Sequence, residues 1–118
     1  MGQSFKDLVV WQRAVQLSIE TYRLTASFPR SEQFGLVNQM RRASVSIASN
    51  IAEGYRRSTK GEYRQFLGHA RGSNCELQTQ LIIASSLGFG EKSGHEGAKK
   101  LSADVSRMLI ALMTSLQN

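Results

Sequence analysis

The sequence is poor in the features that mark secreted, membrane-spanning or metal-binding proteins. Its 118 residues include one cysteine, Cys75, and one proline, Pro29. A single cysteine allows neither an internal disulfide nor a cysteine metal cluster. No run of about 18 apolar residues occurs, so we expect no membrane-spanning helix. The first residues, MGQSFKDLVV, lack the basic and then apolar pattern of a secretion signal. We therefore expect a protein of the reducing cytoplasm.

Acidic residues are scarce relative to basic ones. The chain has 15 lysine and arginine residues against 9 acidic residues, a net charge of +6 and an isoelectric point near 10.0. Such a balance favours anionic partners, which include RNA, DNA and acidic protein surfaces. Many basic proteins carry their charge for solubility alone, so composition leaves both interpretations open.

The distribution of apolar residues predicts an all-α protein. Apolar side chains recur at spacings of three and four residues, and no alternating strand pattern occurs. The predicted helices cover about residues 5–27, 31–54, 60–87 and 96–116, with short connections between them. Similar lengths and short connections are typical of an up-down-up-down antiparallel four-helix bundle. We expect one such domain over residues 1–118.

The first predicted helix carries two apolar stripes. One comprises Leu8, Trp11, Val15, Ile19, Tyr22 and Ala26, and the other comprises Val10, Ala14, Leu17, Leu24 and Phe28. A helix that packs on one side needs only one stripe. The second stripe indicates either a broad buried face in a small bundle or a contact with another subunit.

Basic residues gather at the connection between the second and third helices. Between residues 55 and 71 the only acidic residue is Glu62, so the segment carries 5 − 1 = +4. Its cations are Arg56, Arg57, Lys60, Arg64 and Arg71. The planar fork of arginine suits phosphate groups, so these five are the candidate nucleic-acid contacts, with Lys99 and Lys100 as weaker candidates. The alternative is that a helix corner is solvated and therefore charged.

Base stacking is not expected at this corner. Tyr55 and Tyr63 lie close by in the sequence, but their periodicity places both on the core side of their helices. Contact with phosphates, without reading of bases, is the predicted form of binding.

Polar residues beside the core face of the second and third helices suit structural or interfacial roles. These residues are Arg41, Arg42, Asn50, Glu53 and Glu76. A hairpin that turns near residues 58 and 59 places Arg41 and Arg42 level with Glu76. An arginine–glutamate pair, buried or between subunits, is therefore predicted. Glu53 and Arg57 have the spacing of a helical ion pair.

No catalytic or metal-binding pattern stands out. His69, Ser73 and Glu76 share one helix flank, but His69 and Glu76 are separated by roughly 10 Å of helix rise. A catalytic triad needs hydrogen-bond contact between its members. The Glu-x-x-His spacing of metal-binding bundles and the lysine-containing phosphate loop are both missing from the sequence. We expect no enzymatic activity, no cofactor and no metal.

Two motifs carry a resemblance to a known family. They are QMRRAS followed by SNIAEG, within residues 39–54, and ARGSNCEL, residues 70–77. Over roughly residues 5–90 the sequence resembles the bacterial four-helix bundle proteins, also called 23S ribosomal RNA intervening-sequence proteins. The resemblance implies a short cytoplasmic protein that assembles into a ring-like homopentamer, and it supplies no catalytic residues.

The resemblance extends to a related branch, the accessory variability proteins of diversity-generating retroelements. These bind nucleic acid and a reverse transcriptase through a basic surface. Two functions are therefore predicted. The first is a homo-oligomeric bundle that binds RNA or DNA by phosphate contacts. The alternative is a protein-interaction scaffold, such as an accessory subunit of a reverse transcriptase, with only non-specific affinity for nucleic acid.

Overall fold

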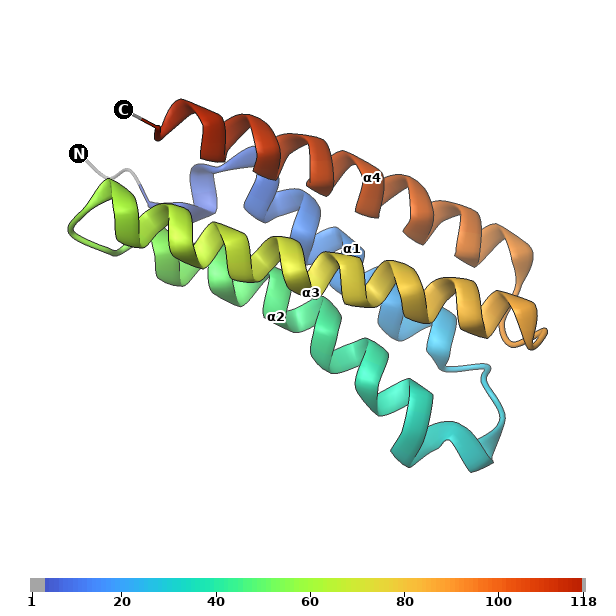
Figure 1. Cartoon of the computed structure of the whole chain (residues 1–118). Coiled ribbons are helices and arrows are strands. Elements are labelled where there is room, and N and C mark those ends of the chain that lie inside the picture. The colour runs from blue at the N-terminus through green and yellow to red at the C-terminus, as the bar shows by residue number, and fades with distance from the viewer. Residues whose placement is uncertain (1–3, 118) are drawn as a thin grey trace.

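The structure is a bundle of four antiparallel helices. The computed structural model describes residues 4–117, with helices α1 (Val9–Thr25), α2 (Asn38–Tyr55), α3 (Lys60–Ser86) and α4 (Lys92–Ser115). Helices α1 and α3 each pack against both α2 and α4. The α2–α3 turn lies at the same end of the bundle as the C-terminal end of α4 (Figure 1). The predicted all-α, up-down-up-down fold is confirmed. The domain predicted over residues 1–118 includes residues 1–3 and 118, which lie outside the described residues.

Helix α1 begins four residues later than the sequence predicted. The side chain of Ser4 accepts a hydrogen bond from the backbone N–H of Lys6, and Asp7 accepts one from the N–H of Ser4. This capping box closes a single 3₁₀ turn, Phe5–Asp7, instead of a long helix. Leu8 is then extended, and the α-helix starts at Val9.

The second predicted helix is divided in the structure. A 3₁₀ turn at Arg30–Glu32 and a π turn at Gln33–Val37 precede α2. Gly35 interrupts the helical geometry with φ −110° and ψ −108°. The periodicity of the apolar residues continues through this segment, which is why the sequence predicted one uninterrupted helix.

Helix α4 begins at Lys92, four residues before the predicted start at Glu96. Gly88 and Gly90 have φ values of +77° and +83° and form the turn after α3. Gly94 lies inside α4, where an added Cβ atom would stand 2.9 Å from Leu24 Cδ1. This glycine therefore reflects close packing against α1, and its presence misled the prediction of a longer loop.

The core is built from one of the two stripes of α1. Val10, Ala14 and Leu17 are buried, whereas Ile19 and Tyr22 of the other stripe remain exposed. The largest fully buried side chains from the other helices are Met40, Ile47, Ile51, Leu67, Leu77, Val105 and Leu109. Leu8 and Trp11 of this second stripe are partly buried against the core, so its exposed part lies toward the C-terminal end of α1.

A polar pair lies inside this core and was not predicted. Asn74 Nδ2 donates to the backbone carbonyl of Ser102 at 3.0 Å, and Ser102 Oγ donates to Asn74 Oδ1 at 2.7 Å. Both residues are buried. These bonds join α3 to α4 and satisfy two side chains that would otherwise lose their hydration without compensation.

The glycines of α2 and α3 differ in their packing. Nothing lies within 4 Å of a Cβ added at Gly72, and only Met113 Cε approaches one added at Gly68, at 3.9 Å. The close approach occurs at Gly54, where an added Cβ would stand 2.9 Å from Phe66 Cβ and 3.2 Å from the Tyr63 carbonyl oxygen.

Alanine substitutions at Gly54 and Gly72 should therefore change stability in opposite directions. We expect Gly72→Ala to raise the free energy of unfolding by about 0.5–1 kcal/mol, because alanine is the better helix former. We expect Gly54→Ala to lower it by about 1–3 kcal/mol, because the helices must separate. Urea denaturation of the two variants measures both effects. Equal shifts would contradict the packing described at Gly54.

Candidate nucleic-acid interface

Two of the five predicted contact residues are engaged by an acidic neighbour. Arg57 Nη2 lies 2.9 Å from Glu53 Oε2, and Arg56 Nη1 lies 3.5 Å from Glu53 Oε1. The pairing predicted between Glu53 and Arg57 is confirmed. The guanidinium carbon of Arg57 also stands 4.5 Å from the centroid of the Phe66 ring. Arg57 is thereby held on the α2-facing side of α3, with its charge partly compensated.

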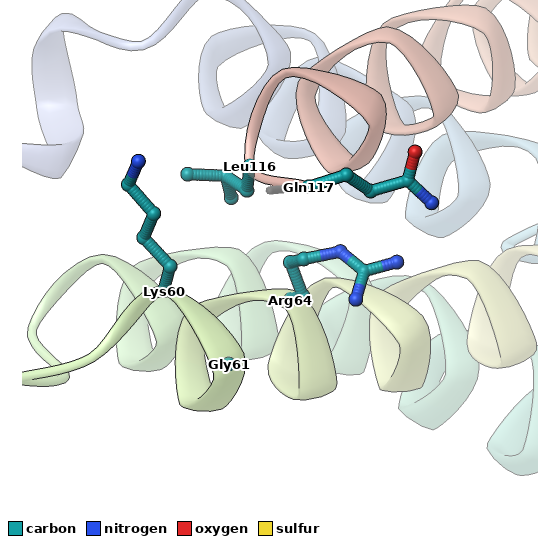
Figure 2. A pocket seen from close by; sticks show the side chains of 5 residues that line it. All are labelled: Lys60, Gly61, Arg64, Leu116 and Gln117. Atoms are coloured by element: carbon teal, nitrogen blue, oxygen red, sulfur yellow. The ribbon is translucent and has the colours of Figure 1, made fainter.

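Two other predicted residues meet at the C-terminal end of α4. Figure 2 shows Lys60 and Arg64 extending from α3 toward Leu116 and Gln117, around a hollow of about 440 Å³. Arg64 Nε donates to the carbonyl of Met113 at 3.2 Å. A helix C-terminus carries unpaired carbonyls and partial negative charge, which suits a cation. Arg64 therefore anchors α4 as well as contributing charge to the surface.

Arg71 lies farther along the same side of α3. It is exposed and follows Arg64 by seven residues, about two turns of helix. Gln78, seven residues farther on, lines a second and larger hollow between α3 and α4, of about 780 Å³. Because Arg64 and Gln78 both line hollows between α3 and α4, the helical repeat places Arg71 between them on the same groove.

Helix α4 adds two lysines to this groove. Lys92 and Lys99 both line the larger hollow. Since the antiparallel helices are joined at Asn74 and Ser102, Lys99 lies roughly level with residue 77 and Lys92 with residue 84. We call the resulting line the α3–α4 basic row, and its members are Lys60, Arg64, Arg71, Lys99 and Lys92.

The α3–α4 basic row is little compensated by acids. Among the described residues that line its two hollows, Glu96 is the only acidic one. At about 1.5 Å per residue, the part of α3 from Lys60 to Ser85, which borders both hollows, is roughly 37 Å long. The sequence located one basic corner, whereas the structure divides it, with Lys60, Arg64 and Arg71 on the α4 side and Arg56 and Arg57 beside Glu53.

Lys100, a weaker candidate in the sequence, belongs to another face. There Arg107 donates a hydrogen bond to Asp104. That bond holds the pKa of the Asp104 carboxyl below its usual value. The nearby positive charges of Arg107, Arg13 and Lys100 lower the pKa further. Lys99 and Lys100 are adjacent in the sequence but point to different faces because successive residues of a helix are about 100° apart.

The predicted pairing of Arg41 or Arg42 with Glu76 does not occur within residues 4–117. Arg41 turns toward α1 instead. Its Nε donates to Thr25 Oγ1 at 2.9 Å and its Nη2 donates to the carbonyl of Tyr22 at 3.2 Å, while its guanidinium carbon lies 4.5 Å from the centroid of the Tyr22 ring. Arg41 therefore anchors the end of α1, and Arg42 and Glu76 are exposed.

Asn50 contributes to a hydrogen-bonded contact between α2 and α3. Its Nδ2 donates to the carbonyl of Ser46 at 2.9 Å, and the hydroxyls of Ser46 and Ser73 lie 2.9 Å apart. Ser73 is thus bonded to α2, and the rings of His69 and Phe66 meet edge to face with centroids 5.6 Å apart. His69 and Ser73 thus have separate partners and do not contact each other through these bonds.

The two tyrosines near the basic corner pack against each other. The rings of Tyr55 and Tyr63 meet edge to face with centroids 6.1 Å apart. Burial, with a smaller effect from Tyr55, raises the pKa of Tyr63. Both tyrosines therefore serve the packing of α2 on α3.

Residues 4–117 contain neither a cluster of metal-binding side chains nor a membrane-crossing helix. No group of three or more His, Cys, Asp or Glu side chains in this part of the chain is placed to hold a metal ion. None of its helices combines the length and the apolar character required to cross a membrane.

Comparison with known proteins places this fold in a family. The family model described as 23S rRNA-intervening sequence protein matches residues 6–111. The chain belongs to this family. The intervening-sequence family thus includes all four helices of the bundle up to the last turn of α4. No curated protein sequence matches the chain.

A solved structure of another protein has the same fold. It is the crystal structure of a protein of unknown function from the S23 ribosomal protein family of Bacteroides thetaiotaomicron, with a TM-score of 0.82 and 18% sequence identity. The match covers 90% of this chain and 96% of that chain. At this identity the likeness concerns the fold.

The structural role of Arg64 can be separated from its charge. We expect Arg64→Ala to lower the free energy of unfolding by about 0.5–1.5 kcal/mol, because the hydrogen bond to Met113 is lost. Arg71→Ala removes the same charge from an exposed position and should change stability by less than about 0.5 kcal/mol. Urea denaturation compares the two variants. Equal losses would show that Arg64 does not anchor α4.

Proposed function

We propose that the chain is a non-enzymatic nucleic-acid-binding protein that contacts phosphates along the α3–α4 basic row. The observation that supports this proposal is the placement of Lys60, Arg64, Lys92 and Lys99 around two hollows of one groove, with Glu96 as the acid there among the described residues. Phosphate neutralisation by such a line of cations supplies affinity without sequence specificity.

The division of the predicted basic corner refines this proposal. Arg56 and Arg57 share Glu53, so a phosphate would have to compete with that carboxylate. Lys60, Arg71 and Lys99 have no ion pair among the described residues and are exposed. Phosphate contact therefore costs less at these positions than at Arg56 and Arg57.

Neutralising these three residues tests the site. We expect Lys60→Gln, Arg71→Gln and Lys99→Gln together to weaken binding to RNA or DNA. The slope of log affinity against log salt should fall in magnitude by about 2, since each single-strand phosphate contributes about 0.7. Fluorescence anisotropy over a salt titration measures both quantities.

A control with equal net charge distinguishes a site from general attraction. Lys6→Gln, Arg30→Gln and Arg42→Gln also remove three exposed cations without an ion pair among the described residues, all outside the groove, and should leave the slope nearly unchanged. Equal losses in the two triple variants would contradict the row. Absence of binding by the unchanged protein at physiological salt would favour the scaffold function, in which the chain serves another protein such as a reverse transcriptase.

Self-association is a second candidate property and has its own surface. The less buried stripe of α1 meets α2 at a shallow groove of about 310 Å³. Its lining is mainly apolar and comprises Trp11, Val15, Ser18, Ile19, Val45, Ala48, Ser49 and Ala52. Exposed apolar surface of this kind is typical of protein interfaces. We propose that it contacts a second copy in a homo-oligomer, for which the family resemblance suggests a pentamer. Several linked copies would make weak phosphate contacts additive.

A charge placed in this α1–α2 groove should disrupt the assembly. We expect Ile19→Glu to shift the protein from oligomer to monomer, because an unpaired charge would be buried in the interface. Ile83→Glu is the control, since Ile83 is equally exposed, at 45%, but lies on α3. Light scattering after size-exclusion chromatography gives the mass. An oligomer that survives Ile19→Glu would rule out this interface.

A further inference from the structure

The wide end of the α3–α4 groove differs from the rest of the groove. It holds the hollow of about 780 Å³, whose apolar lining includes Leu81, Ile82, Phe89 and Ala103. Gln78, Ser85 and Ser86 add hydrogen-bonding side chains to the same lining. Ligand pockets of about 300–1,000 Å³ commonly combine an apolar surface with a few polar groups in this way. Binding of phosphate groups alone would not require an apolar pocket.

The end wall of this hollow is held in place by packing. His95 Nε2 donates to the carbonyl of Phe89 at 2.7 Å. The rings of Phe89 and His95 both pack on Phe28, with centroid distances of 5.7 Å and 6.4 Å. Gly90, at φ +83°, leaves no space for a Cβ, which would stand 2.7 Å from Leu24 Cδ1. An aromatic side chain is thus presented by a constrained turn.

Lys92 and Lys99 line this hollow and also belong to the α3–α4 basic row, so the hollow lies directly beside the row. An apolar pocket with an aromatic wall at the end of a cationic groove matches the two parts of an unpaired nucleotide strand, namely its bases and its phosphates. We propose that the wide end of the groove receives unpaired bases, so that the protein binds a single strand in preference to a duplex. Bases stacked inside a duplex cannot enter a pocket of this kind.

The shape of the groove favours a strand over a protein helix as its occupant. A docked amphipathic helix needs apolar anchors at regular intervals along its groove. Here the narrow hollow is lined by Lys60, Gly61, Arg64, Leu116 and Gln117, so the apolar lining is concentrated at the wide end. The cations that continue beyond it suit the repeated charge of a nucleic-acid backbone.

This inference rests on the proposed function. Three nucleic-acid probes distinguish binding of bases in the hollow from binding of phosphates along the row. Anisotropy is measured with a single strand of mixed sequence, an abasic strand of the same length, and a duplex of the same sequence. We expect the single strand to bind about tenfold tighter than the abasic strand, which corresponds to roughly one base contact. Inclusion of a free nucleoside monophosphate as competitor shows whether the pocket accepts a nucleotide outside a strand.

Two neighbouring isoleucines provide a matched pair of variants. Ile82 lines the hollow and is 68% exposed, whereas Ile83 is 45% exposed and absent from its lining. Both are solvated enough for asparagine to be tolerated. Ile82→Asn should remove the preference for the single strand over the abasic strand, and Ile83→Asn should retain it.

The base pocket and the proposed phosphate binding are contradicted by different outcomes. Equal binding of single strand and abasic strand, or tighter binding of the duplex, overturns the base pocket and leaves phosphate binding intact. Failure of all three probes to bind at physiological salt overturns the proposed function and the pocket together. Binding of an acidic amphipathic peptide in the groove, with the single strand unbound, assigns the groove to a protein partner instead.

Discussion

The buried hydrogen bonds between Asn74 and Ser102 determine how α3 is aligned with α4. Each residue donates to the other across the helix interface. A shift of one helix by a turn would leave both side chains buried without partners, which costs far more than the bonds themselves contribute. Apolar contacts between helices discriminate less sharply among registers. This polar pair therefore sets which cations of α4 stand opposite those of α3, and the groove depends on it.

Two arginines show why a count of charges overestimates the cations available to a ligand. Arg41 donates to the carbonyl of Tyr22 in the last turn of α1, and Arg64 donates to the carbonyl of Met113 in the last turn of α4. Both satisfy helix ends that a neighbouring helix brings close. Four cations that are exposed and have no acidic partner among the described residues, Lys60, Arg71, Lys92 and Lys99, lie along the side of the bundle where α3 meets α4, and this placement supports the functional proposal.

Helical periodicity predicted the number and order of the helices because each helix buries one face against its neighbours. The predicted third helix, residues 60–87, agrees with α3 to within one residue. Its start is well defined because the side chain of Thr59 caps the first turn. The early start of α4 was missed because Gly94 serves packing against Leu24, which is remote in the sequence. The direction of Arg57 toward Phe66 and of Arg41 toward Tyr22 depends on tertiary contacts. For the same reason the sequence located the charge but not the groove.

Cys75 offers the most direct test that the groove is the binding surface. It is the single cysteine, it is exposed, and it lies four residues beyond Arg71 and three before Gln78, on the same side of α3. The measurement is the rate of Cys75 alkylation by N-ethylmaleimide with and without a saturating single strand. Binding in the groove predicts a clearly slower rate in the bound protein. An unchanged rate with the strand fully bound would place the nucleic acid elsewhere and contradict the account.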